Sequence, residues 1–163
     1  MPDEARGKTG RPTETRNKPA RPRDRLGRPQ AWGAENTLEL EDYDALSLEE
    51  NDRLGREHLL AGRYFPAHEA WETAWKQARD TDDAEFYKGL SQLGAGLVHL
   101  QRGNAHGAVR LLRRAAHRVG RYPSGHRGVA TERVARGAEA LADGIDAGDV
   151  VPGEGARFEA PVL

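Results

Sequence analysis

The 163-residue sequence has no cysteine, no long apolar run and only 37% apolar residues. Without cysteine there is no disulfide and no thiolate metal site, which suits a reducing compartment. No segment approaches the roughly 20 apolar residues of a membrane helix, and the N-terminus lacks the apolar run of a signal peptide. We therefore expect a cytoplasmic protein with no membrane partner.

The low mean hydropathy of -0.82 indicates that part of the chain does not contribute to a core. Residues 1–34 form a basic segment rich in arginine and proline, predicted to be an arm that is either disordered or docked. An acidic linker over residues 35–46 follows it. We predict one helical domain over residues 47–148 and an irregular tail over residues 149–163.

Helix signals dominate the central segment. Ser47 followed by Glu50 matches a capping box, and Gly62 is typical of a helix end. Similar start and stop signals predict further helices over about residues 64–79, 84–102, 104–119 and 131–148. The fold class is therefore an all-α single bundle of about five helices. Small and apolar residues recurring over residues 96–115 predict an antiparallel hairpin with packing like that of tetratricopeptide repeats.

The third predicted helix contains three glycines, Gly89, Gly94 and Gly96. Glycine inside a helix costs about 1 kcal/mol relative to alanine, so these positions need a structural reason. Close approach of a neighbouring helix is the expected reason. We predict that Trp71 and Trp75 of the second helix fill the space opposite the glycines.

The second predicted helix carries the most informative pattern. Five residues share one helical stripe that should face the core: Phe65, His68, Trp71, Glu72 and Trp75. A buried imidazole or carboxylate without a partner costs several kcal/mol, so His68 and Glu72 need partners. The stripe therefore predicts a buried polar cluster.

Several linked motifs give the chain a family resemblance. His68, Glu72 and Trp75 form the pattern H-x-x-x-E-x-x-W, and it is followed by Gly89-Leu90, Gln92-Leu93, His99, Arg102-Gly103-Asn104 and Gly107-Ala108. Over about residues 54–119 this order resembles the bacterial and archaeal domain of unknown function family 309. The resemblance implies an all-helical protein without an assigned activity, and a motif suggested to bind metal. The family usually has an aliphatic residue where this chain has Trp71 or Ser91, a departure expected to affect packing.

The candidate metal site combines His68 and Glu72 with His99 of the next helix. Two imidazoles and one carboxylate with an open position suit a divalent metal such as zinc. Glu69 stands beside His68, as the general base does in H-E-x-x-H enzymes, but Glu72 replaces the second histidine of that motif. We expect three residues to support the site: Tyr64, Trp75 and Gln92.

Three interpretations remain open. His68 and Glu72 could form only a buried hydrogen-bonded pair that fixes helix register, in a binding or scaffold module with a protein partner or a second copy. They could hold a metal, with a metal-dependent hydrolase using Glu69 as an alternative. The fourth predicted helix presents Arg110, Arg113 and Arg114 on one face, which with the arm could bind nucleic acid or an acidic partner.

Overall fold

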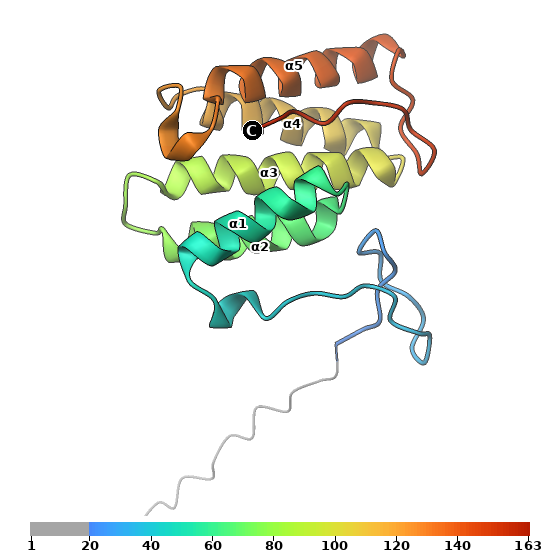
Figure 1. Cartoon of the computed structure of the whole chain (residues 1–163). Coiled ribbons are helices and arrows are strands. Elements are labelled where there is room, and N and C mark those ends of the chain that lie inside the picture. Colours follow the sequence, from blue (N-terminus) through green and yellow to red (C-terminus); the bar gives the residue numbers. More distant parts are fainter. Residues whose placement is uncertain (1–19) are drawn as a thin grey trace, which may run out of the picture.

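The computed structural model describes residues 20–163, which form an all-α bundle (Figure 1). Its helices are α1 (Leu48–Leu60), α2 (Tyr64–Gln77), α3 (Ala84–Gln101), α4 (Ala105–Val119) and α5 (Thr131–Ala147). Two short 3-10 helices, η1 (Tyr43–Ala45) and η2 (His126–Gly128), lie in connecting segments. The described chain has no β-structure beyond an isolated bridge between residues 23 and 29. The predicted fold class is confirmed.

The helix ends follow from local sequence. Ser47 Oγ accepts from the Glu50 backbone N–H at 3.2 Å, and the Glu50 carboxylate accepts from the Ser47 N–H at 2.8 Å, so the predicted capping box is present. Asn104 caps α4 by accepting from the Gly107 N–H at 2.9 Å. The positive φ of Gly62, +72°, explains why a glycine follows α1.

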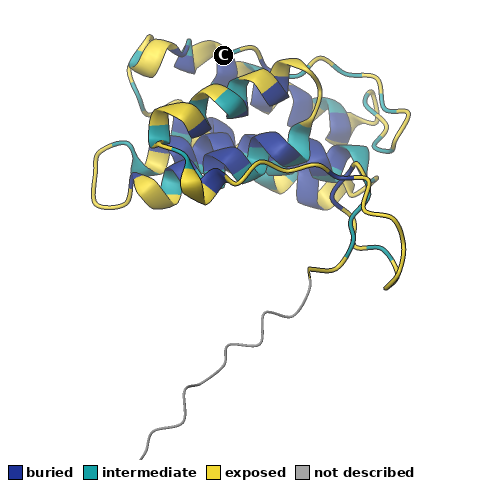
Figure 2. Ribbon diagram, turned by 60° about the horizontal axis from the view of Figure 1, so that its bottom comes forward, coloured by how far each residue is buried: buried dark blue, intermediate teal, exposed yellow. Residues whose placement is uncertain are grey.

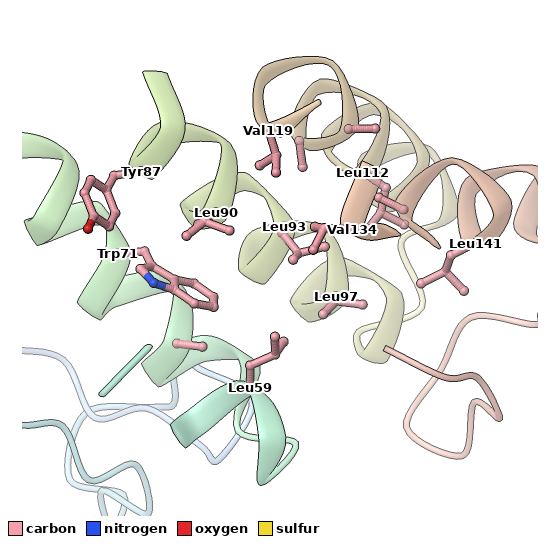
Figure 3. Close-up of a cluster of buried hydrophobic side chains, with 14 of the residues drawn as sticks. Leu59, Trp71, Tyr87, Leu90, Leu93, Leu97, Leu112, Val119, Val134 and Leu141 are labelled. Atoms are coloured by element: carbon pink, nitrogen blue, oxygen red, sulfur yellow. The ribbon is translucent and has the colours of Figure 1, made fainter. Parts of the chain in front are cut away.

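Each helix packs against the next helix in the chain, from α1 through α5 (Figure 1). Buried positions lie mainly on the helix sides that face one another, while the outer sides and loops are exposed (Figure 2). Trp71 and Tyr87 lie at one end of the apolar core, and Leu112, Val134 and Leu141 lie toward the other (Figure 3). Within residues 20–163, no helix combines the length and apolar character needed to cross a bilayer.

The glycines of α3 do mark close approach, on two sides of the helix. A Cβ added to Gly94 would lie 2.9 Å from the backbone nitrogen of His68 in α2. On the other side, a Cβ at Gly89 would lie 2.8 Å from Val119 Cγ2 in α4. The predicted partners were wrong, because neither Trp71 nor Trp75 is among the atoms nearest these glycines. Trp71 packs instead over Gly55 of α1, where an added Cβ would lie 2.5 Å from the indole.

The inner face of α2 also differs from the predicted stripe. Its fully buried residues are Ala67, Ala70, Trp71 and Ala74, which recur at helical spacing. His68, Glu72 and Trp75 are half-buried, on the border of this face. Small alanines occupy the centre because α1 and α3 both press on α2, and the longer polar side chains extend to the edge. The predicted burial of the polar cluster is therefore corrected to half-burial.

Residues before α1 contact the bundle at several places. Leu26 is only 4% exposed, and its carbonyl accepts from Arg102 Nε and Nη2 at 3.1 and 2.8 Å. Further along, the Glu41 carboxylate accepts from Tyr43 Oη at 2.6 Å and pairs with the buried His58 at 3.0 Å. Burial raises the pKa of Glu41, but the hydrogen bond from Tyr43 and the contact with His58 lower it more. Residues 1–19 of the predicted arm lie outside the described residues.

The tail after α5, residues 149–163, has no helix, yet it packs on the bundle. The Gly153 N–H donates to the Leu100 carbonyl at the end of α3, at 2.8 Å. The Phe158 ring lies 5.9 Å from the Tyr64 ring, centroid to centroid. The tail thereby covers the start of α2 with apolar side chains.

Asp83, just before α3, ties down the loop that carries η2. Its carboxylate accepts from Arg127 Nη2 at 2.7 Å and from His126 Nε2 at 2.6 Å. Burial raises the pKa of Asp83, but the hydrogen bonds from Arg127 and then His126 outweigh burial and lower it overall. Because the folded pKa lies below the unfolded one, the stabilisation is complete above about pH 4 and is lost as pH falls through the folded pKa.

We therefore expect Asp83→Asn to lower the free energy of unfolding at pH 7 by about 1–3 kcal/mol and to flatten its decline below about pH 4. Urea unfolding at a series of pH values measures both effects. Asp82→Asn is the matched control, since that exposed neighbour has no side-chain ion pair within residues 20–163. Equal pH profiles for Asp83→Asn and wild type would contradict this role of Asp83.

Candidate metal site

Three side chains of α2 gather at the border between α2 and α3. His68, Glu69 and Glu72 occupy positions i, i+1 and i+4, which one helical surface brings together. His68 Nε2 lies 3.8 Å from Glu69 Oε1 and 3.7 Å from Glu72 Oε2. One ligand atom from each residue falls within 4.8 Å of the other two. We call these three residues the His68 cluster.

The other nitrogen of His68 is fixed by α3. Nδ1 lies 3.0 Å from the backbone carbonyl oxygen of Ser91, which can only accept, so Nδ1 carries the proton. Ser91 Oγ is also 3.0 Å from Nδ1 and donates to the His68 carbonyl at 3.4 Å. Nε2 is the remaining ring nitrogen, and it faces the two carboxylates. A histidine that binds metal typically donates its other N–H to a backbone carbonyl in this way.

The His68 cluster is open enough for an ion to reach it. The side chains of His68, Glu69 and Glu72 are 24%, 32% and 34% exposed. Lys76 Nζ lies 3.6 Å from Glu72 Oε1 and offsets part of the negative charge. Because both carboxylates keep contact with water, the cluster avoids the large desolvation cost of fully buried charges.

The donor set fits a divalent metal. One imidazole nitrogen and two carboxylate oxygens are ordinary ligands of zinc, at distances of about 2.0–2.2 Å. Tetrahedral coordination at those distances places ligand atoms about 3.4 Å apart. The observed separations are a few tenths of an ångström larger, and half-exposed glutamates can close that gap by small rotations. Three protein ligands would leave at least one position for water.

His99, expected as a third ligand, lies outside the His68 cluster. Its Nδ1 is 2.9 Å from the side-chain nitrogen of Asn104, the residue that caps α4. Since α3 runs past α2 with Gly94 opposite His68, the position five residues further along α3 falls more than a helical turn away. Glu69, expected as a general base, takes the place in the cluster that was assigned to His99.

The residues expected to support the site make their contacts elsewhere. Tyr64 packs against Phe158, Lys88 Nζ lies 5.0 Å from the Trp75 ring, and the Gln92 side-chain oxygen accepts from Arg118 at 3.2 Å. Ser91, expected to affect packing more than chemistry, touches His68 directly through its hydroxyl. The resemblance had marked Ser91 as a departure from the expected family pattern, and this was the signal available in the sequence.

The basic face of α4 is partly neutralised within the bundle. Arg113 Nη2 pairs with Asp143 and Asp146 of α5 at 3.0 and 2.9 Å, and Arg118 pairs with Glu85 of α3 at 2.9 Å. Arg110 and Arg114 are exposed and have no ion pair within the described chain. Arg113 therefore ties α4 to α5 as well as contributing charge to the surface.

The fold and site define a class: an all-α bundle with a half-exposed histidine and two glutamates on its second helix. Residues 53–111 match the family model described as Domain of unknown function (DUF309), which confirms the resemblance seen in the sequence. The match begins in α1, ends in α4 and includes the whole His68 cluster. No curated protein and no solved structure matches the chain.

Proposed function

We propose that this protein is a helical binding module that holds one divalent metal ion through His68, Glu69 and Glu72. The observation that carries the proposal is the orientation of His68, whose Nε2 faces the two carboxylates while Nδ1 donates to the Ser91 carbonyl. A purely structural His–Glu pair needs one carboxylate at hydrogen-bond distance. Here both separations, 3.7 and 3.8 Å, are longer than a hydrogen bond and leave space between the donors.

A metal-dependent hydrolase is less well supported than a binding module. Such an enzyme needs an open metal position and a separate group to accept a proton from the bound water. The carboxylate expected in that second role, Glu69, belongs to the ligand group itself. A metal that organises a binding surface needs only the ligands.

Zinc titration of protein purified without a histidine tag tests the proposal. We expect one ion per chain for wild type and at least about 100-fold weaker binding for His68→Ala, since that change removes the only nitrogen ligand of the cluster. Isothermal titration calorimetry measures both. His117→Ala is the matched control, because His117 is exposed on α4 and should leave the affinity unchanged. Equal weakening in both variants, or no stoichiometric binding by wild type, contradicts the proposal.

A further inference from the structure

The hydrogen bond between His99 and Asn104 determines which ring nitrogen of His99 carries the proton. Asn104 Oδ1 accepts from the Gly107 N–H at 2.9 Å, so the side-chain nitrogen of Asn104 is the atom that faces His99 Nδ1 at 2.9 Å. That nitrogen donates, and Nδ1 must accept. The proton of the neutral His99 ring therefore sits on Nε2. His68 and His99 are thus fixed in opposite forms, one with a lone pair on Nε2 and the other with an N–H.

Positive charge gathers around His99. Arg102 follows His99 by three residues at the end of α3. Burial lowers the pKa of His99, and the positive charge of Arg102 lowers it further. Arg110 is three residues from Gly107, where an added Cβ would lie 2.9 Å from His99 Nδ1. The α4 surface that touches His99 therefore also carries Arg110.

Arg102 is a half-buried cation that lacks a carboxylate partner within residues 20–163. Its Nε and Nη2 donate to the Leu26 carbonyl, which leaves Nη1 free to donate elsewhere. Arg23 is similarly bonded to a carbonyl, that of Gly27, at 2.5 Å. Burial lowers the pKa of Arg102; Asp24 raises it, while Arg23 and Arg28 lower it. Asp24 and Glu154 pair with Arg28, whereas Arg23 and Arg102 have no carboxylate partner within residues 20–163.

Phe65 connects this positive region to the His68 cluster. The guanidinium carbons of Arg23 and Arg102 lie 5.6 and 5.8 Å from the centroid of the Phe65 ring. The His68 ring lies 6.1 Å from the same centroid, in an edge arrangement. Two arginines and the proposed metal ligand thus lie around one aromatic ring, and Arg102 is three residues from His99 in the chain.

We propose that His99, Arg102 and Arg110 bind an oxyanion beside the His68 cluster, with Arg23 adding charge. The inference rests on the proposed metal site, because the anion would lie between the ion and the arginines. A phosphoryl group suits this setting better than a carboxylate, since several cations and a divalent ion favour a dianion. The module would then recognise phosphorylated ligands.

Calorimetric titration of inorganic phosphate into the metal-free full chain tests the anion site by itself. We expect Arg110→Ala to weaken phosphate binding about three- to fivefold, while Arg114→Ala, one turn further along α4 and equally exposed, leaves it nearly unchanged. His99→Leu should weaken binding about tenfold, and His99→Gln, which restores an N–H donor, should recover part of the loss. Acetate is expected to bind more weakly than phosphate.

Manganese then tests the position of the anion. In wild type loaded with one Mn²⁺, the ³¹P relaxation of bound phosphate should be strongly enhanced, and Arg110→Ala should reduce the enhancement. Equal effects of Arg110→Ala and Arg114→Ala, acetate binding as tightly as phosphate, or no phosphate binding by wild type would overturn the anion proposal. Phosphate binding without any metal binding would instead contradict the proposed metal function alone.

Discussion

Replacing Trp71 with alanine is expected to lower the free energy of unfolding by about 3–5 kcal/mol. The side chain is fully buried between α1 and α3, in contact with Gly55 and close to Tyr87 (Figure 3). Its indole N–H donates to Asp52 Oδ1 at 3.1 Å. The substitution therefore removes a large apolar volume and one hydrogen bond, and the three surrounding helices cannot close the cavity without losing their own packing.

Chemical denaturation by urea measures this loss. Trp75→Ala is the control on the same helix, because Trp75 is half-exposed and packs against the edge of the core with Lys88 over its ring. We expect its cost to be less than half that of Trp71→Ala. If both variants lose the same stability, Trp71 does not have the central packing role that the structure gives it.

Substituting Gly94 by alanine should destabilise the protein by about 1–3 kcal/mol. Elsewhere in a helix interior, replacing glycine by alanine usually raises the free energy of unfolding by about 0.5–1 kcal/mol. The sign reverses here because an added Cβ would lie 2.9 Å from the nitrogen, 3.0 Å from the Cα and 3.1 Å from the Cβ of His68. The backbone of His68 cannot move aside as a flexible side chain can, so α2 and α3 must move apart. The hydrogen bond between His68 and Ser91 should then lengthen.

Gly144→Ala in α5 provides the matched comparison. An added Cβ there meets Val150, whose Cγ2 lies 3.2 Å away at the end of a side chain that can rotate. We expect this variant to be neutral or slightly more stable than wild type. Zinc affinity should fall in Gly94→Ala and remain unchanged in Gly144→Ala. Stabilisation by both substitutions would show that α2 and α3 have more room than the structure indicates.

The helices could be predicted from sequence because their ends are encoded locally. Ser47 with Glu50, Asn104, Gly62 and Gly148 each act on backbone groups within a few residues. Such signals work whatever the rest of the fold does. The same holds for the glycines of α3, whose cost inside a helix indicated a close neighbour before that neighbour was known.

The buried face of α2 was harder to predict from the sequence. Periodicity alone makes an alanine and an aromatic residue equivalent candidates for the core, and it favoured the large residues His68, Glu72 and Trp75. Helices on both sides of α2 approach so closely that alanines fill the centre. Only Trp71, which has Gly55 opposite it, could be accommodated there.

The candidate site was predicted in part. His68 and Glu72 share a cluster because they are one turn apart on the same helix. The third member depended on the offset between α2 and α3, which sequence spacing does not contain. That offset places Ser91 against His68, and His99 against the start of α4. Glu69 joined the cluster instead because it is adjacent to His68 on the same helix.

Proton-detected nitrogen NMR of the His68 imidazole tests the central claim most directly, because it reports which ring nitrogen carries the proton. In metal-free protein near pH 8 we expect the proton on Nδ1 and a lone pair on Nε2, and one equivalent of zinc should shift the Nε2 resonance of His68. His99 serves as the internal comparison, with the opposite form and no shift typical of zinc coordination. A proton on Nε2 of His68, or a zinc shift at His99 instead, would contradict the proposed site.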